Sequence, residues 1–152
     1  MRFAASRIVL TLALTTAVAA APGKPKLTVK ANPTMAFSPA RVVVSGDLTG
    51  GVDNDQQLYC LGVEWEWGDG TKSEDSADCE PFETAKSEIK RHFTAEHTFR
   101  MEEQAASVGQ QPDYRDVHIQ LRLKKSNKVV VSGGTTVKIK PEMAPTAASR
   151  LP

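Results

Sequence analysis

The chain has 152 residues, with 19 lysine and arginine side chains, 18 aspartate and glutamate side chains, and a formal net charge of +1 at pH 7. The charges of both signs are interspersed along the chain, which excludes the clustered positive surface of a nucleic-acid-binding protein. A chain of this length suits one domain that buries a core of its own.

The N-terminal segment predicts export. Arg2 and Arg7 give a basic start, residues 8–20 form an apolar run, and residues 17–19 are the small side chains that a signal peptidase recognises. A retained membrane anchor is the alternative, but the run is shorter than the ~20 residues that a spanning helix needs. We therefore expect a signal peptide over residues 1–19, a secreted or periplasmic product with no membrane span after cleavage, and a flexible leader over residues 20–26.

Alternating apolar residues predict the first two strands. Leu27, Val29 and Ala31 mark one strand, and Val42 and Val44 mark the next. Residues 49–55 follow as an exposed loop rich in turn-forming residues. Its two aspartates invite a calcium interpretation, but the further acidic ligands, central glycine and closing glutamate of a calcium-binding loop are missing, so no metal site is predicted.

The central strand covers residues 61–67 and ends in a sharp turn. Trp65 and Trp67 lie on its apolar face, and both are expected in the core. Glu64 and Glu66 lie on the opposite face, which we expect to be solvated, although a pair of carboxylates could also mimic a hydrolase site. The sequence Gly68-Asp69-Gly70 then reverses the chain, because glycine accepts positive φ and aspartate bonds nearby amides.

Three further strands are expected towards the C-terminus. One covers residues 88–99, and a second is marked by the apolar residues at 117, 119, 121 and 123. Ser126-Asn127 predicts a hairpin turn into a last strand, with a bulge or bend at Gly133-Gly134. Pro141 ends that strand, and residues 142–152 are expected to be a disordered tail.

These elements predict an all-β fold, because about seven short alternating strands separated by turns are typical of an antiparallel sandwich. One domain over residues 27–141 is expected. Cys60 and Cys79 are the two cysteines, and in an oxidising compartment an even number of cysteines predicts a disulfide. A zinc site is the alternative, but the pair lacks a Cys-x-x-Cys spacing.

The residues 65–70, Trp-Glu-Trp-Gly-Asp-Gly, resemble the Trp-Asp-Phe-Gly-Asp-Gly signature of polycystic kidney disease (PKD) domains. His97-Thr98-Phe99 is similar to the His-Thr-Tyr of that family, and the strand from Val117 to Leu121 is similar to its last strand. The resemblance implies an immunoglobulin-like β-sandwich and a non-catalytic module for binding or spacing. It also implies a structural role for the motif residues Trp65, Trp67, Gly68, Asp69, Gly70, His97 and Phe99.

The sequence contains no nucleophile elbow, His-Glu-x-x-His motif or phosphate-binding glycine loop. His92 and His118 fall on polar strand faces, and His97 falls with the apolar residues, where a hydrogen-bonded structural role is expected. The sequence therefore predicts a protein that is not an enzyme, with no catalytic residue and no cofactor. A small exported hydrolase is the alternative.

Few aromatic residues are left for a binding surface once both tryptophans are assigned to the core. Tyr59, Phe82 and Tyr114 remain, which favours an extracellular or envelope protein as partner over a polysaccharide, because sugar-binding surfaces present rows of aromatic rings. We expect recognition in the long connection over residues 71–86. The candidate binding residues there are Glu74, Asp75, Asp78, Glu80 and Phe82.

Overall fold

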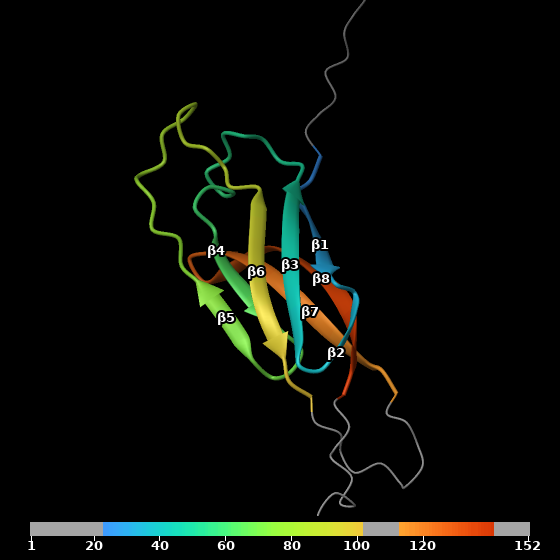
Figure 1. Ribbon diagram of the computed structural model, residues 1–152. Helices are drawn as coiled ribbons and strands as arrows, with labels where there is room; N and C mark the ends of the chain where they lie inside the picture. Colours follow the sequence, from blue (N-terminus) through green and yellow to red (C-terminus); the bar gives the residue numbers. More distant parts are fainter. Residues whose placement is uncertain (1–22, 102–112, 142–152) are drawn as a thin grey trace, which may run out of the picture.

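The computed structural model of the chain describes residues 23–101 and 113–141 (Figure 1). Within these residues no helix is present, and therefore none that is long and apolar enough to cross a membrane. The strands are β1 (Lys26–Asn32), β2 (Met35–Phe37), β3 (Ala40–Thr49), β4 (Gly62–Glu66), β5 (Lys72–Asp75), β6 (His92–Phe99), β7 (Arg115–Lys125) and β8 (Lys128–Lys140). The expected signal peptide over residues 1–19 and the expected tail over residues 142–152 lie outside the described residues.

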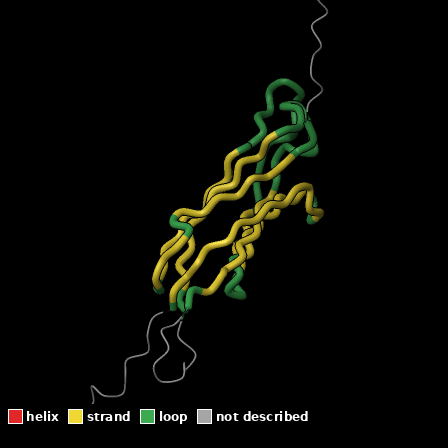
Figure 2. The backbone as a smooth tube through the Cα atoms, turned by 90° about the vertical axis from the view of Figure 1, so that its right-hand side faces the viewer, coloured by secondary structure: helices red, strands yellow, loops and turns green. Residues whose placement is uncertain are grey.

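Two sheets face each other, as Figure 2 shows edge-on. The smaller sheet has the order β1-β3-β6, and the larger sheet has the order β2-β8-β7-β4-β5. All neighbours are antiparallel except β2 and β8, which pair in parallel. The predicted all-β sandwich is confirmed.

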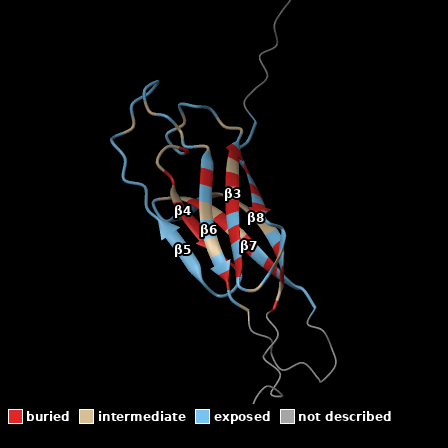
Figure 3. Ribbon diagram, in the orientation of Figure 1, coloured by how far each residue is buried: buried red, intermediate tan, exposed pale blue. Residues whose placement is uncertain are grey.

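The core fills the space between the two sheets, and the burial of each long strand alternates along its length (Figure 3). Val42 and Val44 from β3 meet the apolar residues of β7, because every second side chain of a strand points to the same face. At Gly46 a Cβ atom would lie 2.3 Å from the Leu121 side chain, so the absence of a side chain there lets the two sheets approach.

The first strand, β1, begins earlier than the sequence predicts. Lys26 is already part of β1, and the carbonyl of Gly23 accepts a hydrogen bond of 2.7 Å from the amide of Gly51. Residues 23–26, which were expected to belong to a flexible leader, are therefore bonded to the domain.

Two strand boundaries differ from the sequence prediction. The strand expected over residues 88–99 begins only at His92. The side chain of Arg91, just before it, donates hydrogen bonds to the carbonyl of Gly50 and the carboxylate of Asp53. A further strand, β5, lies within residues 71–86, which were expected to form a loop. All four residues of β5 are exposed, so no alternation of apolar side chains marked it.

The last hairpin is confirmed, but its bulge is in another place. Ser126 and Asn127 both have positive φ, 49° and 65°, as a tight two-residue turn requires. The register shifts between Leu123 and Lys124 opposite residues 129–131, and not at Gly133-Gly134. Gly133 serves close packing, because a Cβ atom there would lie 2.5 Å from the carbonyl oxygen of Leu27.

Candidate functional site

The motif residues after β4 form a packed corner at one end of the sandwich, which we call the Trp67 corner (Trp67, Gly68, Asp69, Thr71 and His97). The Trp67 and His97 rings stack with centroids 4.5 Å apart and planes 9° apart. The indole nitrogen of Trp67 donates a hydrogen bond of 2.9 Å to Ser73. Gly68 has φ of 76°, and a Cβ atom there would lie 2.3 Å from the carbonyl oxygen of His118, so only glycine fits.

Asp69 ties the turn to the smaller sheet. Its carboxylate accepts hydrogen bonds from the Thr71 amide (2.9 Å) and hydroxyl (2.6 Å), and its other oxygen lies 2.7 Å from Nε2 of His97. Burial alone would raise the pKa of Asp69, but the hydrogen bonds from Thr71 and His97 outweigh burial and lower the pKa below its usual value. His97 is therefore held in the corner by a hydrogen bond and by stacking on Trp67.

The opposite end of the sandwich carries the two long connections, residues 50–61 between β3 and β4 and residues 76–91 between β5 and β6, which together we call the loop end (Figure 1). The predicted bridge between Cys60 and Cys79 joins them, with the Cα atoms 6.1 Å apart. The rings of Tyr59 and Phe82 pack with centroids 5.3 Å apart, and the Tyr59 hydroxyl donates to the carbonyl of Glu80. These contacts hold the two connections against each other.

A second brace lies further along the same connections. The guanidinium of Arg91 contacts the Asp53 carboxylate at 2.6 Å and the Gly50 carbonyl at 2.9 Å. An open cavity of about 500 Å³ lies beside this pair, between residues 53–54 and residues 85–91. The loop end thus combines exposed polar groups with a fixed backbone.

The five candidate binding residues are not brought together as one loop. Glu74 and Asp75 belong to β5, and Glu74 lies 3.7 Å from Lys124 on the outer face of the larger sheet. Asp78 and Glu80 are exposed on the loop end, whereas the ring of Phe82 is half-buried against Tyr59. Phe82 was expected to be an exposed apolar contact surrounded by acidic residues. Instead, its ring packs against Tyr59 and holds the loop in place, and its acidic neighbours form the exposed part.

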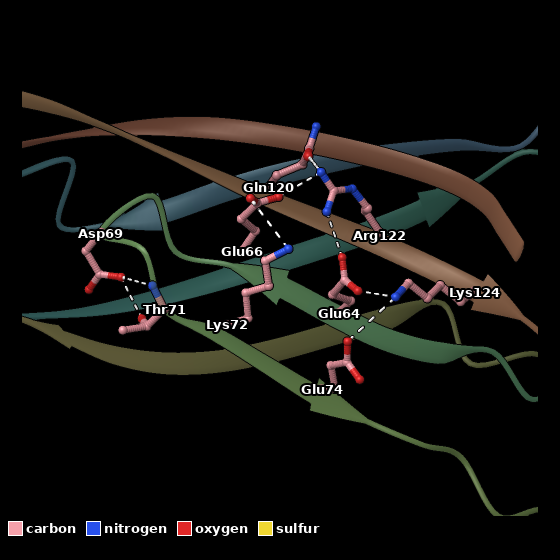
Figure 4. Close-up of polar contacts among 9 residues, drawn as sticks. All are labelled: Glu64, Glu66, Asp69, Thr71, Lys72, Glu74, Gln120, Arg122 and Lys124. Carbon is pink, nitrogen blue, oxygen red and sulfur yellow. Dashed lines mark hydrogen bonds and ion pairs between the residues drawn. The ribbon is translucent and has the colours of Figure 1, made fainter. Parts of the chain in front are cut away.

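Glu64 corrects the expectation of a solvated face. Its side chain is only 8% exposed and lies under two long cations of β7 (Figure 4). Nη1 of Arg122 is 2.7 Å from Oε1 of Glu64, Nζ of Lys124 contacts the other oxygen, and Nη2 of Arg122 is 2.7 Å from Glu66. The carboxylates are therefore held in a network of ion pairs.

The hydrogen bond from Lys124, followed by that from Arg122, lowers the pKa of Glu64 from 4.5 to about 2. A carboxyl group that exchanges protons in catalysis needs a pKa near the working pH. A carboxylate held ionised by two cations suits a fixed ion pair and not proton transfer at Glu64.

The three histidines are spread over the molecule. His92 lies 2.8 Å from Asp47 on the outer face of the smaller sheet, and His118 lies 3.0 Å from the Thr136 hydroxyl on the outer face of the larger sheet. Among the described residues, no group of three or more histidine, cysteine, aspartate or glutamate side chains is placed to hold a metal ion.

The sequence prediction missed a second candidate surface on the outer face of the larger sheet. An open trough of about 530 Å³ lies over β4, β7 and β8, and exposed apolar side chains of β2 lie on the same sheet. Tyr114 was noted as a residue left for a surface, but its neighbour Phe37 was not, because β2 is a strand of three residues. The two prolines that flank β2, Pro33 and Pro39, were the only local sign of a short separate element.

No protein-family model matches the chain, and a comparison with curated protein sequences finds no relative. The resemblance to PKD domains therefore stands on the motifs of the sequence itself.

Proposed function

We propose that the protein is an exported, non-catalytic binding module whose loop end receives a protein partner. The observation that carries this proposal concerns residues 76–91. A disulfide, a ring contact and an ion pair hold this segment in place, although none of its residues belongs to the buried core. Ordering a surface segment costs conformational entropy. A segment braced in this way loses less entropy on binding, which favours affinity.

The charge of the loop end indicates the kind of partner. Residues 50–61 and 76–91 carry six acidic and three basic side chains. Asp53 is paired with Arg91 and Glu83 with Lys86, whereas Asp78 and Glu80 are exposed outside these pairs. A surface of this sign favours a partner with lysine or arginine at its contact, and complementary charge raises the rate of association. The proposed partner is therefore an extracellular or envelope protein with a basic contact surface.

Two observations support the other parts of the proposal. A disulfide between Cys60 and Cys79 fits an oxidising compartment outside the cytoplasm. The lowered pKa of Glu64 argues against acid and base catalysis at the paired carboxylates.

A capture experiment tests the proposal. The purified domain is used as bait in the envelope and secreted fractions of the source cells, and the captured protein is then titrated against the variant Asp78→Lys/Glu80→Lys. We expect at least about tenfold weaker binding for this variant, the loss typical of a binding hot spot, and weaker binding of the original domain at high salt. A matched charge reversal far from the loop end, Glu96→Lys on β6, serves as the control and should bind normally. Equal affinity of both variants for the captured partner contradicts the placement of the site.

A further inference from the structure

The outer face of the larger sheet presents exposed aromatic side chains at one end. Phe37 is 66% exposed and Tyr114 is 37% exposed, and their ring centroids lie 6.2 Å apart. Nζ of Lys140 lies 5.8 Å from the Tyr114 ring, between the two strands that carry the rings. Met35, on the same face of β2 as Phe37, is also exposed. We call these residues the ring patch.

Large apolar side chains at the surface cost solvation free energy unless something covers them. Phe37 contributes little to the core, because the side chain of β2 that packs against the core is that of Ala36. The ring patch therefore has no evident role in folding, and it is a candidate contact for a ligand.

The trough continues this face along β7 towards the other end of the sheet. Its walls carry Glu66, His118, Gln120, Arg122 and Thr136, and its floor includes Gly134, which has no side chain. His118, Gln120 and Arg122 alternate with the buried residues of β7 and therefore project from its outer face. Tyr114 directly precedes β7, and its ring lies beside that of Phe37. The ring patch and the trough lie on the same face of the larger sheet, with the Asp116–Lys138 ion pair between them along β7.

The charges in and beside the trough are paired with one another. Arg122 is paired with Glu66 and Glu64, Lys72 lies 3.8 Å from Glu66, and Lys138 lies 2.8 Å from Asp116. Gln120 accepts a hydrogen bond from Arg122, and Nδ1 of His118 lies 3.0 Å from the Thr136 hydroxyl. What remains for a ligand is the outward side of this network, namely the amide nitrogen of Gln120, Nε2 of His118, the second bonding capacity of the Thr136 hydroxyl and the outer atoms of the ion pairs. Such a set suits an uncharged ligand with many hydroxyl groups.

From these observations we infer that the outer face of the larger sheet binds a neutral polysaccharide, with sugar faces against Phe37 and Tyr114 and sugar hydroxyls in the trough. Aromatic rings offer apolar area with a defined geometry, and pockets that recognise polar ligands place a few polar groups around them. The distance along the chain decides between a single sugar and a polymer. His118 is four positions after Tyr114, which directly precedes β7, and four extended residues span about 13 Å. A ligand that uses both parts is therefore a polymer.

A protein partner fits this face less well. The arginine and glutamate of the trough are paired with each other, so, unlike the acidic loop end, they offer a protein partner no net charge to complement, and the core of a protein interface is depleted of such groups. This second site is independent of the loop end, which lies elsewhere on the molecule.

The test measures binding of the whole exported domain to neutral polysaccharides, namely cellulose, chitin, xylan and starch, and to the anionic polymer alginate. We expect binding to at least one neutral polymer and weaker binding to alginate. The variant Phe37→Ala/Tyr114→Ala should lose about tenfold or more in affinity, as expected for removed aromatic anchors. Thr136→Glu, which places an unpaired charge in the trough, should also weaken binding.

Controls separate this site from general effects and from the loop end. Val43→Ala removes an exposed apolar side chain from the outer face of the smaller sheet, and it should bind the polymer normally. Asp78→Lys/Glu80→Lys should also bind it normally, so failure of one site is distinguishable from failure of the other. The folded state of each variant is checked by circular dichroism and thermal unfolding.

Four outcomes overturn the inference. Three of them are no binding of the original domain to any neutral polymer, equal binding by the folded double variant Phe37→Ala/Tyr114→Ala, and tighter binding to alginate than to every neutral polymer. A ring patch variant that loses a captured protein but retains the polysaccharide would show that this face docks a protein, and it would overturn the inference as well.

Discussion

The Trp67 corner and the loop end lie at opposite ends of the sandwich and are held by different kinds of interaction (Figure 1). In the corner, stacking of Trp67 on His97 and the bonds of Asp69 each need one residue type at one position. At the loop end, the Cys60–Cys79 bridge fixes two connections whose other positions are mostly exposed. The fold thus places its most specific packing at one end of the sandwich and its most exposed connections at the other.

The largest expected effect is at the tryptophan strand that leads into the corner. Trp65 is 4% exposed and stacks on Trp67 with centroids 5.6 Å apart. Trp65→Ala should lower the free energy of unfolding by ~3–5 kcal/mol, the range for deleting a large buried aromatic side chain. Urea denaturation followed by circular dichroism measures this. A loss no larger than that of Val43→Ala would show that Trp65 is not a core residue.

Removal of the disulfide should have the next largest effect on stability. The loss of protection should appear first in the loop that the bridge closes. The bridge closes a loop with a sequence separation of 19, and its removal in Cys60→Ala/Cys79→Ala should cost about 3 kcal/mol by loop-closure entropy. Peptide mapping of non-reduced protein should find Cys60 linked to Cys79. Hydrogen exchange should increase in residues 76–91 before it increases in β7. Uniform loss of protection over both would contradict the separation between the two ends.

Alanine substitutions at two glycines test how closely the Trp67 corner packs against the His118 backbone. Gly68→Ala places a Cβ atom against the His118 backbone at positive φ, whereas at Gly70, also at positive φ, no atom lies within 4 Å of the added Cβ. Gly70→Ala should cost about 1–2 kcal/mol, the strain of a left-handed residue. Gly68→Ala should cost more, because the clash is added. Equal losses in thermal unfolding would mean that the His118 backbone moves aside.

The smallest effect is expected for Glu64→Gln, and it should depend on pH. The folded state lowers the pKa of Glu64 from 4.5 to about 2, so the ionised form stabilises the fold. This stabilisation is complete above about pH 4.5 and is lost as the pH falls towards 2. The difference in unfolding midpoint between the original protein and Glu64→Gln should therefore be greatest near neutral pH and vanish in strong acid. Glu74→Gln, at an exposed carboxylate, should give a smaller difference, and a constant difference across this range would contradict the ion-pair assignment.

The sequence predicts the long strands well, because burial on one face leaves a pattern within the strand itself. Buried and more exposed side chains alternate along most of β7, and the sequence predicts both this strand and the turn at Ser126-Asn127 that follows it. No such pattern exists in β5, where every residue is exposed and pairing with β4 is made by the backbone. The sequence of β2 also gives no strand signal, because three residues are too few to show an alternation of apolar and polar side chains.

The candidate surfaces depend on contacts that are distant in sequence. Glu64 lies on the polar side of its strand, and it is buried by side chains that are 58 and 60 positions further along the chain. The ring patch similarly joins Phe37 and Tyr114 through the sheet order β2-β8-β7. The disulfide could be predicted because only two cysteines are present in the chain, whereas the partners of Glu64 could not be chosen among many cations.

The positions at which the described chain enters and leaves the sandwich have a mechanical consequence. The chain enters β1 beside the loop end, where Gly23 bonds Gly51, and it leaves β8 at the opposite end (Figure 1). A pull between these two points runs along β1 and β8, and the hydrogen bonds of antiparallel strands lie perpendicular to that direction. All bonds from β1 to β3 and from β8 to β7 would then be loaded together in shear instead of being unzipped one after another. We expect single-molecule stretching between residues 23 and 141 to need a higher force than stretching across the β7–β8 hairpin, and equal forces would contradict this.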